Sequence, residues 1–252
     1  MLREIRKKLV IIENRKPFGA DAVEYLEQTE EEDWICMNLR LEGSELTKED
    51  VSSVIDGGCL RDVAISDYML IDRTRRLRKL IYDGCARGEK LSKATLDRIY
   101  AIASDAKSVN SGLGLEGTDL SVDYRKTNPV IIQLSYNPPL PQEIREQMDL
   151  LFRWLYQKKD FFEVIKNAAH LHNRIIEIYP YPSCNEMVAR TAMFYYLVQE
   201  GLPICNLLYS ESEYNKTIVE YLRKENIDKL NEQLVRGIFN KLDLIMQATD
   251  FK

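Results

Sequence analysis

Apolar residues recur three and four positions apart over most of this sequence, and glycine, proline or capping residues separate the periodic stretches. That spacing is typical of helices that bury one face. It predicts helices over residues 19–42, 47–56, 66–86, 92–106, 141–157, 160–178, 185–200, 211–225 and 227–249. Residues 1–18 are predicted to be an extended or frayed lead-in, and no Pro/Gly/Ser-rich linker divides the helical part.

One stretch departs from the helical period, because residues 129–136 are rich in branched side chains and are followed by two prolines. Such a run predicts a β-strand, and we expect a short hairpin with Val130, Ile131 and Ile132 at its edge. An unpaired strand edge can accept a strand from another chain. The predicted fold class is therefore a mostly α, single helical bundle with one short β-hairpin.

The composition is that of an ordinary globular protein, with 45% hydrophobic and 30% charged residues among 252. A net charge of −5 gives no general attraction to nucleic acid or to an anionic membrane. No stretch approaches the ~20 apolar residues of a membrane span, and the N-terminus lacks the apolar core of a signal peptide. Five scattered cysteines without a CxxC pair favour a reducing compartment over disulfides or zinc. We expect a cytoplasmic protein without a metal site of its own.

Two weaker patterns in the sequence do not indicate a binding site. Gly112–Gly117 formally matches the GxGxxG pattern, but no apolar strand precedes it and no helix follows it, as a dinucleotide site requires. The two histidines, His170 and His172, stand two residues apart on one predicted helix and so point to different faces. They are poor candidates for a metal site, and we expect His172 to be packed or hydrogen-bonded beneath the turn that follows.

The most informative stretch is residues 172–190, which predicts a helix, a tight turn and a second helix. Pro180 and Pro182 interrupt the first helix, because proline lacks an N–H group and clashes with the preceding turn. Ser183 or Asn185 is predicted to cap the second helix. The free N–H groups at that start, with the positive end of the helix dipole, can seat an anion. The alternative is an ordinary corner between two helices.

The residues from Tyr179 to Arg190 resemble the signature of the Fic (Fido) family, His-Pro-Phe-x-Asp/Glu-Gly-Asn-Gly-Arg-x-x-Arg. Pro180, Asn185 and Arg190 are identical to it, and Tyr181 is a conservative replacement of phenylalanine. The flanking elements follow the family's order. The resemblance implies a lead-in and helix over 1–34 and a Fic-like domain over 35–252, with an inhibitory-type helix at about 35–45, a flap at about 129–137 and the motif turn at 179–190.

Members of that family bind a nucleoside triphosphate and move AMP to a hydroxyl of a target protein, so the resemblance implies ATP and Mg²⁺ as cofactors. The histidine acts as base on the hydroxyl, and the carboxylate holds Mg²⁺. The Gly-Asn-Gly backbone closes on the phosphates, and the two arginines hold the outer phosphates. The matching ligand positions in this chain are Ser183, Cys184, Asn185, Glu186, Met187 and Arg190.

The departures from the signature fall on its chemistry. Tyr179 replaces the base, and a phenol with a pKa of about 10 is protonated at neutral pH. Ser183 replaces the metal-binding acid with an uncharged ligand, and Met187 removes the first arginine. Cys184 and Glu186 replace glycines, and Glu186 brings a negative charge to a phosphate site. Ordinary AMP transfer is therefore predicted to be impaired, and Cys184 is expected to be an inert thiol rather than a reactive one.

The stretch Leu41–Thr47 resembles the family's inhibitory helix, in which Glu42 matches the glutamate and Arg190 matches the arginine that pairs with it. Asn38 stands where that motif has serine or threonine. Such a pair would be partly buried, where removal of one partner leaves an uncompensated charge. A regulatory role and a simple brace between two helices are both open. The resemblance also makes the predicted hairpin edge a docking site for a target.

Three functions are open from the sequence. The first is a Fic-like protein that has lost transferase chemistry and binds a ligand, or a protein partner at the flap edge. The second is a divergent nucleotidyl- or phosphotransferase that modifies a protein hydroxyl, with its own Tyr179 among the acceptors. The third is a structural interaction domain in a homo-oligomer. None of the three involves nucleic acid or a membrane.

Overall fold

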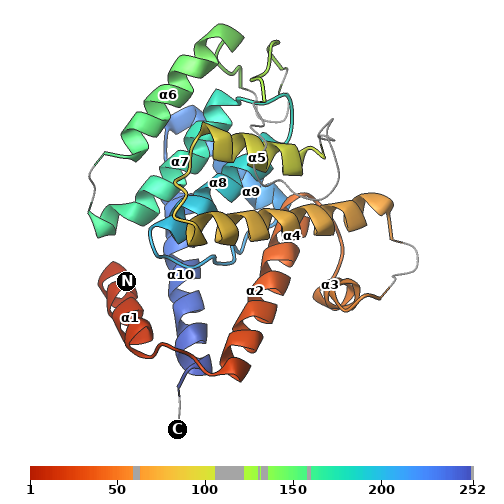
Figure 1. The fold of residues 1–252 in the computed structure, drawn as a ribbon. Helices are drawn as coiled ribbons and strands as arrows, with labels where there is room; N and C mark the ends of the chain where they lie inside the picture. Colours follow the sequence, from red (N-terminus) through yellow and green to blue (C-terminus); the bar gives the residue numbers. More distant parts are fainter. Residues whose placement is uncertain (59–62, 106–121, 130, 132–135, 158–159, 251–252) are drawn as a thin grey trace.

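The protein is described by a computed structural model over residues 1–58, 63–105, 122–129, 131, 136–157 and 160–250. In that part of the chain the regular elements are all helices (Figure 1). The α-helices are α1 (Leu2–Asn14), α2 (Ala20–Leu41), α3 (Lys48–Ile55), α4 (Ile65–Ala86), α5 (Lys93–Ala103), α6 (Ile144–Leu155), α7 (Val164–Ile178), α8 (Asn185–Gln199), α9 (Glu211–Lys224) and α10 (Asp228–Ala248). Short 3-10 helices η2 (Pro141–Glu143) and η3 (Phe161–Glu163) lead into α6 and α7.

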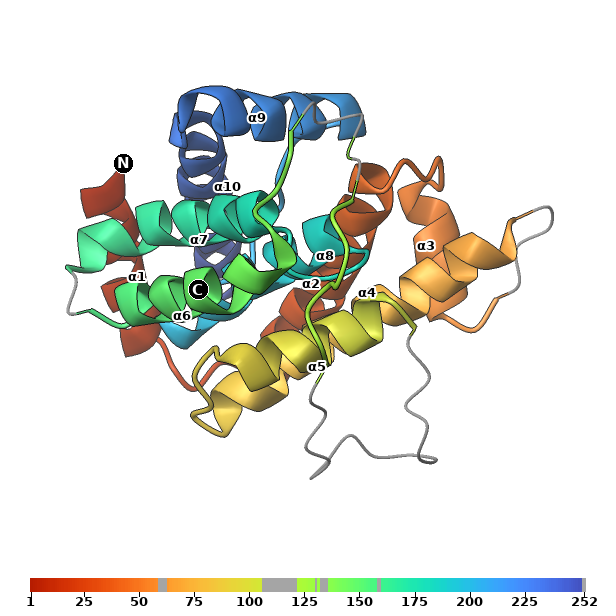
Figure 2. The same cartoon turned by 90° about the horizontal axis from the view of Figure 1, so that it is seen from above.

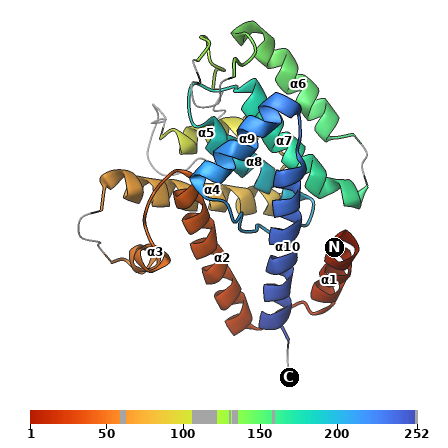
Figure 3. The same cartoon turned by 180° about the vertical axis from the view of Figure 1, so that it is seen from behind.

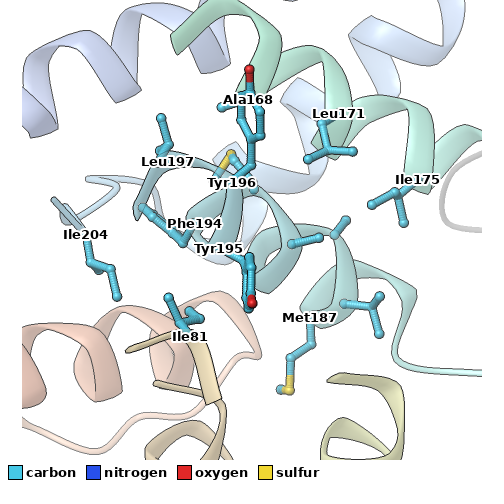
Figure 4. Packing of buried hydrophobic residues seen from close by; sticks show 14 of the residues in the cluster. Ile81, Ala168, Leu171, Ile175, Met187, Phe194, Tyr195, Tyr196, Leu197 and Ile204 are labelled. Carbon is cyan, nitrogen blue, oxygen red and sulfur yellow. The ribbon is translucent and has the colours of Figure 1, made fainter. Parts of the chain in front are cut away.

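Helix α8 is the centre of the fold. Every residue from Met187 to Leu197 is buried, as expected of a helix that is apolar on almost all sides. Helix α7 lies along it, and α4 and α5 pack against it as well (Figure 2). Figure 4 shows Leu171 and Ile175 of α7 and Ile81 of α4 around this helix.

Three helices, α1, α2 and α10, extend away from this centre to the other side of α4 (Figure 1). Helix α1 packs along α10 (Figure 3), and α2 packs against α4. Contacts between the two ends of the chain join α1 to α10, since Lys8 pairs with Asp243 and the Nη1 atom of Arg15 donates to the carbonyl oxygen of Met246 at 2.6 Å. None of the described helices combines the length and the apolar character that a membrane span needs.

The predicted β-hairpin is wrong, and so is the fold class that includes it. The described residues form no strand, and an isolated antiparallel bridge joins Ile131 to Tyr136. Val130 and residues 132–135, Ile132 among them, lie outside the described residues. Three prolines flank the segment and withhold N–H donors from a ladder. A lone pair of short strands is also marginally stable in water.

The extended lead-in predicted for residues 1–18 is wrong as well, because α1 occupies most of it. Ile5 and Ile12 of α1 are buried, and their spacing of seven residues places them on one face. Basic residues lie between these apolar positions and interrupt the helical period, so the pattern did not predict a helix here. The other predicted helices are confirmed, with ends that differ by a few residues. Gly112–Gly117, the rejected GxGxxG match, lies outside the described residues.

We predict that Gly84→Ala destabilises the protein, although alanine is the better helix former. Gly84 lies inside α4, and a Cβ atom there would be 2.3 Å from the hydroxyl oxygen of Tyr195. Tyr195 is fully buried, and its hydroxyl donates to the carbonyl oxygen of Glu89 at 3.0 Å, so the ring has no free space into which to move. Overpacking of this kind costs about 1–3 kcal/mol, which urea denaturation measures as the free energy of unfolding.

The control for this prediction is Tyr195→Phe in the Gly84→Ala background, which removes the atom nearest to the new methyl group. The double variant should lose less stability than the sum of the two single changes. Strictly additive losses would contradict a steric cause.

Candidate functional site

The motif turn joins the end of α7 to the start of α8. Tyr179 closes α7 with a φ of 49°, and Cys184 precedes α8 with a φ of 56°, both in the left-handed region. Residues other than glycine seldom adopt that conformation. Cys184 stands where the signature has a glycine, so the backbone keeps the shape that glycine favours although the residue has changed.

Asn185 holds this turn from inside. Its Oδ1 atom accepts from the N–H of Tyr181 at 3.0 Å, and its Nδ2 donates to the carbonyl oxygens of Tyr181 and Ser183 at 2.8 and 3.3 Å. The side chain is fully buried, so these bonds satisfy polar atoms that water does not reach. The prediction that Ser183 or Asn185 caps α8 is wrong, because the N-cap residue is Cys184 and its side chain makes no capping bond.

Tyr181 ties the turn to α5. Its buried hydroxyl donates to Oδ1 of Asp97 at 2.9 Å, and its ring stacks on that of Tyr100 with centroids 4.4 Å apart. Lys93 approaches the other carboxylate oxygen of Asp97 at 2.5 Å and offsets its buried charge. The hydroxyl that distinguishes tyrosine from the phenylalanine of the signature therefore fastens the turn to a neighbouring helix.

Arg125 clasps the turn from outside the motif. Its Nε donates to the carbonyl oxygen of Tyr179 at 2.7 Å, its Nη2 to those of Ile178 at 3.4 Å and Pro139 at 2.5 Å, and its backbone N–H to that of Pro180 at 2.9 Å. The residue is 3% exposed. A cation is favourable at the carbonyl end of a helix. The sequence indicated Arg125 only as part of the lead-in to the flap. Its Nη1 also donates to the nearby Thr127 and Asn128, but Tyr179 lies 54 positions away, and no local pattern indicates that partner.

Arg190 and Glu42, which the resemblance pairs, lie together in the structure. Arg190 is fully buried; its Nη2 donates to Oε1 of Glu42, and its Nε donates to Oδ1 of Asn38 at 3.3 Å. Burial alone disfavours the charged guanidinium, but Glu42 and Tyr214 raise its pKa, and the net direction is upward. The ring of Tyr214 faces the guanidinium at 5.2 Å. Because Glu42 closes the C-terminal end of α2, where a carboxylate is unfavourable, Arg190 also offsets the helix dipole.

Tyr214 links this pair to His172. The Nε2 atom of His172 lies 2.6 Å from the hydroxyl of Tyr214, and its Nδ1 lies 2.8 Å from Oδ1 of Asn173. Burial lowers the pKa of His172 to about 4, so the ring is neutral at physiological pH. The prediction of a packed and hydrogen-bonded histidine is confirmed. This ring acts as a packing element of the core and does not face solvent as a base.

Burial raises the pKa values of three side chains in and beside the turn. Burial, with the nearby carboxylate of Glu186, raises the pKa of Tyr179 to about 12, so its phenol keeps its proton at neutral pH. Burial also raises the pKa of Glu186 and that of the Cys184 thiol. The thiol donates to the carbonyl oxygen of Ala103 at 3.5 Å. These conditions are those of an unreactive cysteine.

A pocket of about 300 Å³ lies beside the turn. Its lining brings together four of the residues selected from sequence and adds two charged residues of α4 that were not selected: Glu42, Cys184, Glu186 and Met187, with Asp67 and Arg73. It leaves out Tyr179, Ser183, Asn185 and Arg190. Three carboxylates thus share the lining with one guanidinium, and Arg73 is already paired with Asp105 at 3.1 Å. Such a lining repels a polyanion.

The residues present do not fit the ATP and Mg²⁺ that the resemblance implies. Ser183, exposed and uncharged, takes the position of the metal-binding acid. Across the described part of the chain, no group of three His, Cys, Asp or Glu side chains could hold a metal ion. The signature arginine that the chain keeps, Arg190, is committed to Glu42. Polyphosphate binding needs cations that face the ligand, and the described residues of the turn offer none.

The model of the Fic/DOC family matches residues 90–197, which include the proline-containing turn and most of α8, so the resemblance stated from sequence is confirmed. A curated relative, the probable protein adenylyltransferase of Aquifex aeolicus (strain VF5), is 26% identical over 184 residues, which cover 71% of this chain and 51% of the relative. The chain is thus related to protein adenylyltransferases and spans about half the length of that relative.

Solved structures agree on the fold. A Fic-domain-containing signaling protein from Bacteroides thetaiotaomicron VPI-5482 superimposes with a TM-score of 0.71 at 14% identity, over 98% of each chain. Fic-1 from C. elegans superimposes with a TM-score of 0.70 at 15% identity, over 98% of this chain and 70% of that one. At such identities the likeness concerns the fold alone.

We predict that Arg125→Met lowers the free energy of unfolding by about 2–3 kcal/mol, because charged hydrogen bonds to buried carbonyl oxygens are lost. Lys126→Met is the matched control, since Lys126 is the next residue and forms an exposed ion pair with Asp123. It should change stability by less than about 0.5 kcal/mol. Urea denaturation measures the free energy of unfolding of both variants. Equal losses would contradict the role of Arg125 in stabilising the motif turn.

The low pKa of His172 predicts a loss of stability in acid. Between pH 6.5, where a histidine of the unfolded chain takes up a proton, and pH 4, where the folded one does, the unfolded state binds more protons. This contribution is therefore complete above about pH 6.5 and falls by up to about 3 kcal/mol as the pH drops toward 4. Urea denaturation across this range should show the slope in the wild type and in His170→Gln, and a smaller slope in His172→Gln. Equal slopes in all three proteins would refute the assignment.

Proposed function

We propose that this Fic-type site has lost AMP-transfer chemistry and that the protein works by binding. The observation that carries the proposal is the state of Arg190, the signature arginine that the chain retains. It is fully buried, and its Nη2 and Nε atoms are held by Glu42 and Asn38. Arg190 does not line the pocket beside the turn, and breaking its pair with Glu42 to free it for a triphosphate costs about 3–5 kcal/mol.

Two further features support the proposal. Tyr179 occupies the position of the base, and with a pKa raised to about 12 it supplies only a trace of phenolate at neutral pH. Glu186 lines the pocket beside α8, where its carboxylate opposes a phosphate group. A metal ion that could offset this repulsion lacks its acidic ligand, because Ser183 is uncharged.

The chemistry of the pocket limits what it binds. Its lining sets Glu42, Asp67 and Glu186 against Arg73. A ligand with few or no phosphate groups, or a segment of a protein partner, therefore fits better than a triphosphate. In this reading the pair of Glu42 with Arg190 is a brace between α2 and α8, because there is no active centre left to restrain.

A second candidate rests on the Aquifex aeolicus relative, which carries the name of a probable protein adenylyltransferase. In this alternative the chain is a divergent nucleotidyl- or phosphotransferase, and Tyr179 is itself the acceptor. Its side chain is only half-buried, which leaves the phenol partly accessible. The third alternative, an interaction domain in a homo-oligomer, predicts self-association.

Two broader expectations from the sequence belong to this proposal. The scattered cysteines favour the cytoplasm, and Cys36, Cys85, Cys184 and Cys205 are all free thiols. A lead-in and helix over residues 1–34 followed by a Fic-like domain over 35–252 is the division that the resemblance implies.

We predict that isothermal titration with ATP and Mg²⁺ shows no binding tighter than about 1 mM, or about −4 kcal/mol. Glu42→Gly, which releases Arg190, is the matched variant. It should also fail to bind, because Glu186 and Met187 remain. A micromolar, Mg²⁺-dependent signal in the wild type would refute the proposal. The same signal confined to Glu42→Gly would show that the brace alone blocks the site, which also contradicts it.

Intact mass after incubation with ATP, GTP, UTP and CTP separates the second candidate from the first. We expect no gain in mass. A gain of one nucleotidyl group that disappears in Tyr179→Phe would favour the transferase over the binding protein. Light scattering at the same concentrations tests the third alternative, which requires a particle larger than one chain.

A further inference from the structure

A second pocket, of about 860 Å³, is larger than the one beside the motif turn. It lies among α1, α2, α4 and α10, three of which extend beneath α4 in Figure 1. Val198 and residues 201–203, at and after the end of α8, form part of its wall. Because α8 has 15 residues, or about 22 Å along its axis, the length of that helix separates this pocket from the motif turn.

This pocket has two unlike walls. Apolar side chains from three helices form one of them, among which are Ile12 of α1, Leu26 of α2 and Ile245 of α10. Ionisable side chains, centred on Glu30, form the other. Pockets that combine a large apolar surface with a few polar groups orient ligands that are themselves apolar at one end and polar at the other.

Glu30 is the centre of the ionic wall. Its Oε1 atom accepts from Nη2 of Arg78 at 3.0 Å and from the hydroxyl of Tyr82, and its Oε2 lies 3.4 Å from Nζ of Lys241. The side chains of Glu30 and Lys241 are 12% and 8% exposed. Two cations thus face one carboxylate in a place that water hardly reaches, and the cluster carries a surplus of one positive charge.

The cluster also has hydrogen-bond donors without acceptors. The ammonium of Lys241 makes no hydrogen bond, and neither does Nε of Arg78, although both atoms are shielded from solvent. A buried donor without an acceptor destabilises the protein, and most such groups in folded proteins are satisfied. An oxyanion at this position accepts from both cations and removes the surplus charge.

We propose that this pocket binds a small amphipathic anion. A carboxylate or another singly charged oxyanion lies against Lys241 and Arg78, and the apolar body of the molecule lies along the wall formed by Ile12 and Ile245. A neutral apolar molecule leaves the two donors unsatisfied. A ligand with a single charge at one end of an apolar body contacts both walls of the pocket.

The rim of the pocket favours a singly charged anion over a polyanion. Its basic residues are already paired with carboxylates: Arg75 with Glu31 at 2.7 Å, Arg76 with Asp72 at 2.8 Å and Lys79 with Asp83 at 2.8 Å. Further phosphate groups would have to compete with these pairs. The surplus positive charge lies in the cluster around Glu30, and Glu27, which also lines the pocket, adds a carboxylate that further disfavours a polyanion.

The test uses two fluorescent dyes that share one ring system. 8-Anilino-1-naphthalenesulfonate carries a sulfonate group, and N-phenyl-1-naphthylamine lacks it. Fluorescence titration of the full chain measures the dissociation constant of each dye. We expect saturable binding of the sulfonate dye to one site and its displacement by decanoate, a carboxylate on an apolar chain.

Lys241→Met keeps the length of the side chain and removes its charge, which leaves Glu30 paired with Arg78. It should weaken binding of the sulfonate dye by about tenfold, the loss of one charged hydrogen bond, and change binding of the neutral dye by less than about twofold. Lys241→Arg should retain tight binding. Lys229→Met is the matched control, since Lys229 lies on the same helix in an exposed pair with Glu220, and it should change neither constant.

Leu26→Trp places a larger side chain at the partly exposed side of the pocket, and it should weaken the binding of both dyes. If circular dichroism shows that Lys241→Met does not fold, Leu26→Trp provides the test in its place. The proposal is overturned if the wild type shows no saturable binding of the sulfonate dye. Equal losses in Lys241→Met and Lys229→Met, or unchanged binding in Leu26→Trp, would overturn it as well.

Discussion

The need to neutralise one buried guanidinium constrains this structure more than any other interaction. Arg190 lies in α8, the helix that has neighbours on almost every side, and its charge is tolerated because partners reach it from two other helices. Glu42 and Asn38 come from α2, and the ring of Tyr214 comes from α9. An unpaired charge at this depth costs several kcal/mol. Any displacement of the end of α2 would leave such a charge behind, so three helices are held in register by one side chain.

The motif turn beside this pair is held by hydrogen bonds to its main chain. Arg125 binds the carbonyl oxygens where α7 ends, and Asn185 binds the backbone of Tyr181. Because these bonds go to the main chain, they do not depend on the side chains that the turn presents to a ligand. The positions of the base and the metal-binding acid can therefore carry Tyr179 and Ser183 without loss of the turn.

Helical periodicity was sufficient to predict nearly every helix from α2 to α10, because burial of one face dictates where the apolar residues stand. It failed at α1, where basic residues interrupt the apolar positions, and the strand prediction failed in a segment whose flanking prolines oppose pairing. The family resemblance brought Glu42 and Arg190 together correctly. The sequence did not indicate the bonds of Arg125 to the motif turn or the cluster around Glu30, because those partners come from distant parts of the chain and are brought near only by packing.

The left-handed backbone at Cys184 has a consequence for the history of such proteins. A loop that keeps its path without its glycine can exchange side chains one at a time, and each intermediate is still a folded protein. Loss of a chemical step and loss of the fold are then separate events.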